Sequence, residues 1–376
     1  MCRKWNLLIC LVCALTAFST VANGKASAPD PPDGGSSGPY VVLGWAASPA
    51  AVSHDVYFGS DFDDVNGATT ASSEYLNNIP NTTYVLAWPL ELAATYYWRI
   101  DERDIAGSVD KGDIWTFTTV NYLVVDDMES YDLVVRLIHN FWLDGRGNST
   151  GATVGLGVFP LKPVHYGVQS MIYDYDNSVN WAPGYYSEIE AATAGLYART
   201  DWTVSRIKAL TLWFYGTPGN AAGPADEMYV ALEDSSGTMA VVPYDGPAIN
   251  VTIPAWQEWN IPLQDFADIS DVNLANVRKI YIGFGIRGST GPPGGTGTVY
   301  FDDIRLYPPR CMPWIVKPQA DLNDDCIVSF EDLGIMKNEW LTTGIKADLY
   351  MDNHVDFKDF AVLAAGWHEQ VLWPPQ

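Results

Sequence analysis

Two acidic stretches near the C-terminus carry the residues best suited to chemistry in this chain. Carboxylates and apolar residues recur there in the same order, 27 positions apart. The first copy contains Ala320, Asp321, Leu322, Asp325, Val328, Phe330, Asp332 and Trp340, and the second contains Ala347, Asp348, Leu349, Asp352, Val355, Phe357, Asp359 and Trp367. A repeat that keeps both residue types in register predicts two copies of one structural unit.

Each copy presents oxygen atoms at alternate positions of a loop, which is how proteins surround a hard cation such as Ca²⁺. At positions 1, 3, 5, 7, 9 and 12 the first loop offers Asp321, Asn323, Asp325, the Ile327 carbonyl, Ser329 and Asp332. The second loop offers Asp348, Asp352, the His354 carbonyl, Asp356 and Asp359. This is the spacing of EF-hand calcium loops. We therefore expect Ca²⁺ as the cofactor, and the alternative is a pair of acidic turns that bind no metal.

The two loops are not equivalent. Tyr350 stands at position 3 of the second loop, where a short carboxylate or amide is wanted, so we expect this loop to bind Ca²⁺ more weakly. Position 6, usually glycine, is Cys326 in the first loop and Asn353 in the second. Asparagine tolerates the left-handed backbone of such a turn, whereas cysteine does so poorly.

A helical pattern of apolar residues follows each loop. Its members are Leu333, Met336 and Trp340 after the first loop, and Phe360, Leu363 and Trp367 after the second. Two loop-helix halves with aspartate at position 12 resemble a type I dockerin, over residues 318–371. The resemblance implies calcium-dependent attachment to a cohesin-like protein partner. Loop position 10 is Phe330 in one copy and Phe357 in the other, instead of the family's small hydroxyl residue, which leaves open whether that partner is a standard cohesin.

Charge and cysteine content limit the classes of function. The 376 residues carry a formal net charge of −24, so nucleic acid and anionic membranes would be repelled as partners. Two basic residues, an apolar run and small residues predict a signal peptide at residues 1–22, and hence a secreted or cell-surface protein without membrane insertion. In an exported chain, the remaining Cys311 and Cys326 are expected to form a disulfide that holds the first loop.

The N-terminal part of the mature chain is expected to be a spacer. Residues 28–39 are rich in Pro, Gly, Ser and Asp and predict a flexible linker. Short alternating runs over residues 40–119 predict a β-sandwich. The residues Leu92, Ala94, Thr95, Tyr97 and Ile100 resemble the tyrosine corner of fibronectin type III domains, and Trp45 lies where their early core tryptophan does.

Residues 121–308 contain many strand-like runs and predict a two-sheet jelly roll, followed by a linker at residues 309–317. Acidic residues follow the first run and lie within the last, and these two strands can lie side by side in a jelly roll. The pattern resembles the structural calcium site of jelly-roll carbohydrate-binding modules, with Glu129 and Asp303 as the best-matching ligands. The alternative is a set of solvated acids with Arg305 as a partner.

Aromatic side chains are the other candidate chemistry of this segment, because sugar rings stack on exposed indoles and phenols. In the run at residues 210–215, alternation places Trp213 and Tyr215 on the face opposite the aliphatic residues. Trp181 and Tyr185 lie in a loop, where binding residues concentrate. We take these four residues as candidate carbohydrate-binding residues, and the alternative is that they belong to the core.

Paired carboxylates could instead catalyse glycoside hydrolysis, and Glu188 and Glu190 share one strand face. Neither Asp201 nor Glu233 forms a recognisable catalytic pair with them, and we assign no catalytic residue. The expected fold is mainly β, with a fibronectin III-like β-sandwich, a jelly-roll β-sandwich and a small α-helical dockerin-like module. The expected function is that of a secreted, non-catalytic polysaccharide-binding protein with a calcium-dependent attachment module. The alternatives are a glycan-degrading hydrolase or lyase with its active site in residues 121–308, and a structural cell-surface protein.

Overall fold

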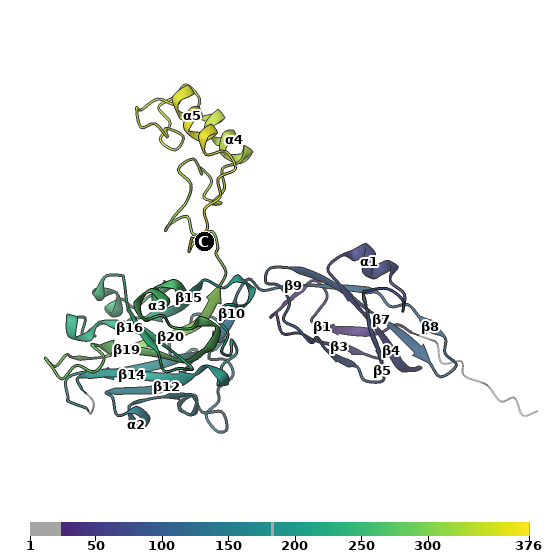
Figure 1. Cartoon of the computed structure of the whole chain (residues 1–376), viewed down its shortest axis with the longest axis horizontal. Helices are drawn as coiled ribbons and strands as arrows, with labels where there is room; N and C mark the ends of the chain where they lie inside the picture. Colours follow the sequence, from purple (N-terminus) through teal and green to yellow (C-terminus); the bar gives the residue numbers. More distant parts are fainter. Residues whose placement is uncertain (1–23, 182–183, 376) are drawn as a thin grey trace, which may run out of the picture. The chain divides into compact units, whose positions relative to one another are not determined.

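The computed structural model describes residues 24–181 and 184–375. The chain divides into two compact units, the first ending at Val120 and the second beginning at Asn121. The signal peptide predicted at residues 1–22 lies outside the described residues. No helix within the described residues is both long enough and apolar enough to cross a membrane. Most regular structure is β-strand (Figure 1), which confirms the mainly β prediction.

The first unit is a β-sandwich. One sheet has the strand order β1 (Ser27–Asp30), β3 (Val42–Ala46) and β6 (Thr83–Val85). The other has the order β2 (Gly35–Ser37), β9 (Ile114–Thr119), β7 (Thr95–Asp104), β4 (Ala51–Gly59) and β5 (Tyr75–Ile79), with β8 (Val109–Asp110) beside β7. A short helix, α1 (Phe62–Gly67), follows β4. The core between the sheets contains Trp45, Trp98 and Trp115.

The prediction of a flexible linker at residues 28–39 is wrong. Strand β1 pairs with β3, and β2 pairs in parallel with β9, so much of this segment belongs to the two sheets. Gly34 also donates a backbone hydrogen bond to the Thr116 carbonyl at 2.8 Å. Strand pairing uses backbone N–H and C=O groups, so a segment with few apolar side chains can still form edge strands.

The tyrosine hydrogen bond predicted near the start of β7 is made by Tyr96 and not by Tyr97. Tyr96 accepts a hydrogen bond at its hydroxyl from the Glu91 backbone N–H, at 3.1 Å. Its ring stacks on Phe58 in the core, with 5.2 Å between centroids. Tyr97 points to the other face of the strand and meets Phe62 edge-on. The sequence assignment of Tyr97 is therefore corrected to Tyr96.

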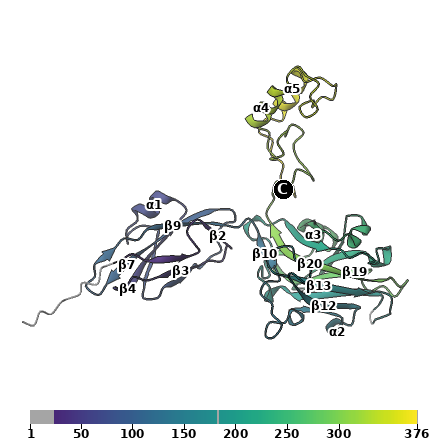
Figure 2. The same ribbon diagram turned by 180° about the vertical axis from the view of Figure 1, so that it is seen from behind.

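Residues 121–308 form two antiparallel sheets packed face to face. The larger has the order β12 (Ala152–Val158), β13 (Gln169–Asp176), β20 (Thr296–Tyr307), β15 (Ala209–Tyr215) and β18 (Trp256–Pro262), with β10 (Leu123–Asp126) beside β20. The smaller has the order β11 (Trp142–Leu143), β14 (Tyr186–Ala192), β19 (Val277–Gly285), β16 (Met228–Asp234) and β17 (Met239–Pro243). We call them the six-stranded and the five-stranded sheet. The views in Figures 1 and 2 show β10 and β20 beside each other, as expected for the first and last strands.

The sequence missed two strands of this sandwich. β11 is only two residues long, and β12 contains Gly155 and Gly157, which break the apolar pattern. Gly157 is required by packing, because a Cβ there would lie 2.7 Å from the Ser170 hydroxyl on β13. Two helices accompany the sheets: α2 (Gly145–Asn148) and α3 (Leu263–Ser270).

The C-terminal repeat folds into α4 (Phe330–Asn338) and α5 (Phe357–Ala365), drawn in yellow-green and yellow in Figure 1. Each helix begins with a capping box, formed by Ser329 with Asp332 and by Asp356 with Asp359. The core between the copies contains Ala320, Leu322, Val328, Met336, Ala347, Leu349, Val355 and Leu363. Phe360 is an exception to the predicted core pattern, since it is 40% exposed. The apolar half of the sequence repeat therefore builds one shared core.

Candidate functional site

The two candidate calcium loops share an unusual backbone. Positions 4 and 6 have positive φ in both copies, at Asp324 (65°), Cys326 (67°), Met351 (60°) and Asn353 (65°). Positive φ is uncommon outside glycine. Its recurrence at the same positions shows that the sequence repeat extends to the loop geometry, including the cysteine that tolerates it poorly.

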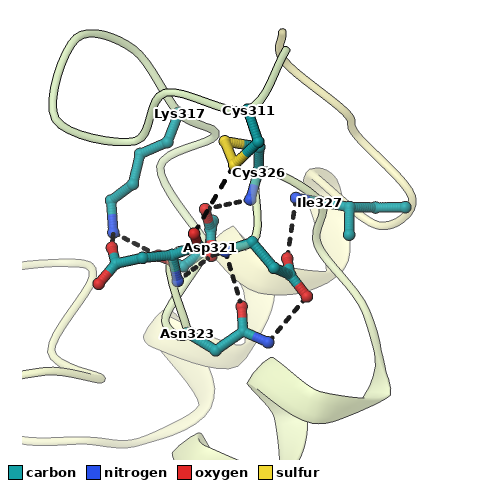
Figure 3. Close-up of a disulfide and its surroundings, with 8 residues drawn as sticks. Cys311, Lys317, Asp321, Asn323, Cys326 and Ile327 are labelled. Carbon is teal, nitrogen blue, oxygen red and sulfur yellow. Dashed lines mark hydrogen bonds and ion pairs between the residues drawn. A yellow bond between two sulfur atoms is a disulfide. The ribbon is translucent and has the colours of Figure 1, made fainter. Parts of the chain in front are cut away.

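In each loop, the carboxylates at positions 1 and 12 accept hydrogen bonds from backbone N–H groups of the loop. Asp321 accepts hydrogen bonds from the N–H groups of Asp324, Asp325 and Cys326 at 2.8, 3.3 and 2.8 Å (Figure 3). Asp348 accepts from Asp352 and Asn353 at 3.1 and 2.8 Å. At position 12, Asp332 accepts from Leu322 and Ser329, and Asp359 accepts from Tyr350 and Asp356. Charged acceptors make these hydrogen bonds strong, so they set the path of both loops.

The side chains at positions 3 and 5 contact other groups. In the first loop the Asn323 amide donates to Asp325 Oδ2 at 2.8 Å. In the second loop Tyr350 is exposed, and Lys358 pairs with Asp352 at 2.6 Å. Across residues 24–181 and 184–375, no three Asp, Glu, His or Cys side chains converge as a metal-binding group. The oxygen-bearing residue types in the loops suit Ca²⁺, and calcium binding itself stays a prediction.

The predicted disulfide between Cys311 and Cys326 is confirmed, with 5.5 Å between the Cα atoms (Figure 3). The C-terminal tail covers the same loop, because Val371 donates a backbone hydrogen bond to the Cys326 carbonyl at 3.1 Å. Cys326 is fully buried as a result, whereas Asn353 at the same position of the second loop is exposed. The disulfide and the tail thus surround only one of the two loops.

The two phenylalanines at loop position 10 lie on the surface of the repeat. Phe330 meets Trp367 edge-on at 4.9 Å between centroids, and Phe357 meets Trp340 in the same way at 5.2 Å. Each ring therefore contacts the tryptophan that ends the other copy. Phe330 is 75% exposed and Phe357 77% exposed, so most of both rings faces solvent.

Glu129 of the acidic jelly-roll edge fixes the loop between β12 and β13. It accepts backbone hydrogen bonds from Val168 and Gln169, both at 2.8 Å. Gly167 has a φ of 78°, and a Cβ there would lie 2.3 Å from Glu129 Oε1, so only glycine allows this approach. Gln169, the first residue of β13, has its Oε1 buried without a hydrogen-bond partner among the described residues.

Asp303 holds the same loop through a different residue. Its Oδ2 lies 2.6 Å from His165 Nδ1, and its Oδ1 accepts from Arg305 at 2.5 Å. Burial, and to a lesser extent the charges of Glu129 and Asp303, raises the pKa of the Asp127 carboxyl. The neighbouring Asp302 has its pKa raised to about 8, mainly by burial and then by Asp303. Asp303 is thus paired with Arg305, the partner named in the alternative interpretation, and a calcium site at Glu129 and Asp303 stays a prediction.

Asp126 is not part of that edge cluster. It accepts hydrogen bonds from the Trp142 indole at 2.8 Å and from the Tyr131 hydroxyl, and it is buried. Its partners join β10 to β11 across the sandwich, so the residue is structural.

Trp213 and Tyr215 lie on the outer face of the six-stranded sheet, while Leu210, Leu212 and Phe214 are fully buried behind them. The His165 ring stacks on Trp213, with 3.9 Å between centroids, and covers part of the indole. Trp256 and Tyr300 meet Tyr215 edge-on at 5.5 and 6.0 Å. These rings form a packed aromatic band, and Trp213 is not a free stacking surface.

Trp181 and Tyr185 lie at the end of the sandwich where β14 begins. Trp181 is 44% exposed. Tyr185 lines a cavity of about 170 Å³ together with Pro224, Ala225, Ile286, Ser289 and Pro292. Ile286 of this lining is followed in the sequence by Arg287, whose side chain lies on the outer face of the five-stranded sheet.

That outer face carries a network of charged and phenolic side chains that the sequence did not reveal. Glu188 accepts hydrogen bonds from Arg287 at 2.8 Å and from the Tyr229 hydroxyl at 2.7 Å. Lys279 donates to Glu190 at 2.9 Å, and the Tyr281 hydroxyl donates to Glu233 at 2.5 Å. The strand register explains the grouping, because Glu188 pairs with Gly283 and Tyr229 pairs with the same glycine from the other side.

Several members of this network are buried although they lie on an outer sheet face. Glu188, Tyr229 and Tyr281 are each about 2% exposed. Burial raises the pKa of Glu188, and the hydrogen bonds from Arg287 and Tyr229 oppose that shift. A buried carboxylate with a shifted pKa and a specific charge partner is a functional-site signal. The acids of the hydrolase alternative, Glu188 and Glu190, are thus each paired with a cation.

Three solved structures show what this chain is similar to. A carbohydrate-binding module from the β-sandwich superfamily, described for promiscuous specificity, has 14% identity and a TM-score of 0.32, covering 76% of this chain and 98% of its own. The xylan-binding CBM22-1 domain from Paenibacillus barcinonensis has 12% identity and a TM-score of 0.30, covering 50% and 93%. An exo-β-agarase has 12% identity and a TM-score of 0.31, covering 50% and 25%. No protein-family model and no curated protein matches the chain.

Proposed function

We propose that the protein is an exported, non-catalytic polysaccharide-binding protein whose jelly roll holds the glycan and whose C-terminal repeat attaches it to a partner. In this proposal the first β-sandwich is a fibronectin type III-like spacer. The glycan site is the outer face of the five-stranded sheet, extended at one end by Trp181 and Tyr185.

The charged network on that face carries the proposal. Sugar hydroxyls both donate and accept hydrogen bonds, and the face offers donors at Arg287 and Lys279 beside acceptors at Glu190 and Glu233. The buried Glu188 holds Arg287 in place. The side chains of Arg287, Lys279 and Glu190 are 35%, 27% and 17% exposed, so a ligand can still reach them although they are paired. Their concentration on one sheet face supports a binding role.

Affinity electrophoresis of the whole protein in gels that contain single polysaccharides tests this assignment. We expect Glu188→Gln to abolish the retardation that the wild type shows. Glu258→Gln is the matched control, because Glu258 also pairs with an arginine, Arg310 at 2.8 Å, but on the six-stranded sheet. Loss of retardation in Trp213→Ala, with Glu188→Gln unaffected, would place the site on the aromatic band instead.

The attachment role is proposed for the C-terminal repeat, with Ca²⁺ in both loops and a cohesin-like protein as partner. Its support is the shared loop backbone and the two exposed pairs, Phe330 with Trp367 and Phe357 with Trp340. A further structural Ca²⁺ is proposed at Glu129 and Asp303, where the unpaired Gln169 oxygen and the buried acids would gain a cation. Isothermal titration of EDTA-treated protein with Ca²⁺ tests these sites, and the absence of any heat would contradict them.

A further inference from the structure

The cations on the outer face of the five-stranded sheet are already neutralised by neighbouring carboxylates. Arg287 pairs with Glu188 at 2.8 Å, and Lys279 pairs with Glu190 at 2.9 Å. Glu233 has no cation within the network and instead accepts the Tyr281 hydroxyl. Three carboxylates and two cations leave this face with a formal charge of −1.

We infer that this face binds an uncharged polysaccharide, as a single soluble chain, and rejects uronate and sulfated glycans. This inference rests on the proposed glycan site and names its ligand class. A carboxylate or sulfate on the ligand would compete with Glu188 or Glu190 for a cation that is already paired. It would also add negative charge beside three carboxylates, one of which, Glu188, is buried and would lose part of its compensation.

An uncharged chain meets no such obstacle. A hydroxyl can donate to a carboxylate oxygen and accept from a neighbouring N–H while both ion pairs stay intact. The rest of the molecule acts in the same direction, since its formal net charge of −24 repels a polyanion before contact.

The phenolic rings of the face argue for hydrogen bonding to a single chain over stacking on a flat crystalline surface. The Arg287 guanidinium lies 5.3 Å from the Tyr281 ring centroid, and Lys279 Nζ lies 5.7 Å from it. Tyr229 lies against the sheet, because a Cβ on Gly283 would come within 2.2 Å of its ring. With both rings about 2% exposed, neither offers an open face to a planar array of sugars.

Affinity electrophoresis with named polymers tests the inference on the whole protein. The uncharged probes are soluble xylan, barley β-glucan, galactomannan and agarose, and the anionic probes are polygalacturonate, alginate and carrageenan. Microcrystalline cellulose is tested by pull-down. We expect at least one uncharged polymer to bind about tenfold more tightly than every anionic one. That binding should be nearly unchanged by added NaCl, because it involves no net charge attraction.

A charge-altered variant sharpens the test. Glu188→Gln with Glu190→Gln converts the face from a formal −1 to +1 and frees both cations. We expect it to lose the uncharged polymer and to gain binding to polygalacturonate that NaCl suppresses. Glu258→Gln removes a carboxylate that pairs with Arg310 on the other sheet, and it controls for the effect on folding of losing such a pair.

Two outcomes would overturn the inference in distinguishable ways. Binding confined to anionic polymers, or to microcrystalline cellulose, contradicts the ligand class and leaves the proposed glycan site standing. Retardation by none of the polymers contradicts both the ligand class and the proposed function.

Discussion

The two loops of the C-terminal repeat have the same backbone but different surroundings. Cys326 in the first loop is buried, bound to Cys311 and covered by the C-terminal tail, whereas Asn353 in the second loop is exposed. Both residues adopt positive φ. The same turn is therefore held in one loop by a covalent link and in the other by a residue that tolerates the conformation. The difference shows that two loops with the same backbone can be stabilised by different contacts.

Removal of the carboxylate at position 1 should reveal the largest difference in stability between the two loops. Asp321→Ala leaves three loop N–H groups without their acceptor in a buried place, and we expect it to destabilise the repeat by about 4 kcal/mol. Asp348→Ala affects two N–H groups in a more exposed loop and should cost about 1 kcal/mol. Hydrogen exchange of the loop amides in EDTA measures both values. Equal losses of stability in the two variants would contradict the expected difference between the loops.

Loss of the disulfide should lower the stability of the first loop toward that of the second loop. Cys311→Ser opens a link across 15 residues, and the chain-entropy model gives a loss of about 3 kcal/mol. Faster hydrogen exchange confined to residues 321–332, without change at residues 348–359, is the expected result. A thiol reductant applied to the wild type should reproduce it and should leave the variant unchanged.

Repair of position 3 should strengthen the second loop. Tyr350→Asn supplies the side-chain oxygen that Asn323 supplies in the first loop, and we expect Ca²⁺ to bind this loop about tenfold more tightly. Asn323→Tyr is the reciprocal variant and should weaken the first loop by a similar factor. Calcium titration with observation of each loop by NMR distinguishes the two. An unchanged affinity in both variants would mean that position 3 is not a ligand.

Exchange of the position 6 residue should give the smallest effect. In a Cys311→Ser background, Cys326→Asn should recover about 1 kcal/mol, because asparagine adopts positive φ more readily than cysteine. The recovery is read as slower hydrogen exchange in the first loop. Cys326→Ala in the same background is the control and should show no recovery.

The loops could be predicted from the sequence because their geometry is local. All ligand candidates of one loop lie within twelve residues, and the 27-residue repeat confirms their register. The β-sandwich and the outward position of Trp213 followed in the same way from alternation along one strand. The pairing of Cys311 with Cys326 followed from counting the cysteines left after export.

The network on the five-stranded sheet could not be predicted, because it depends on register between strands distant in sequence. Glu188 and Tyr229 are 41 residues apart, and Glu188 and Arg287 are 99 residues apart. Nothing near Glu233 in the sequence indicates that Tyr281 is its partner. The stacking of His165 on Trp213 was hidden for the same reason, since a loop of another strand pair brings the histidine there.

The repeat also closes on itself at its two ends. Arg310 and Trp373 exchange backbone hydrogen bonds, both at 2.8 Å, just before the disulfide and just after the tail that covers the first loop. The first and last residues of segment 310–373 therefore lie side by side. A segment with joined ends can be transplanted between two neighbouring residues of another protein without separating them. Within this segment the Cys311–Cys326 disulfide means that cleavage of a bond between the two cysteines would leave both fragments covalently linked.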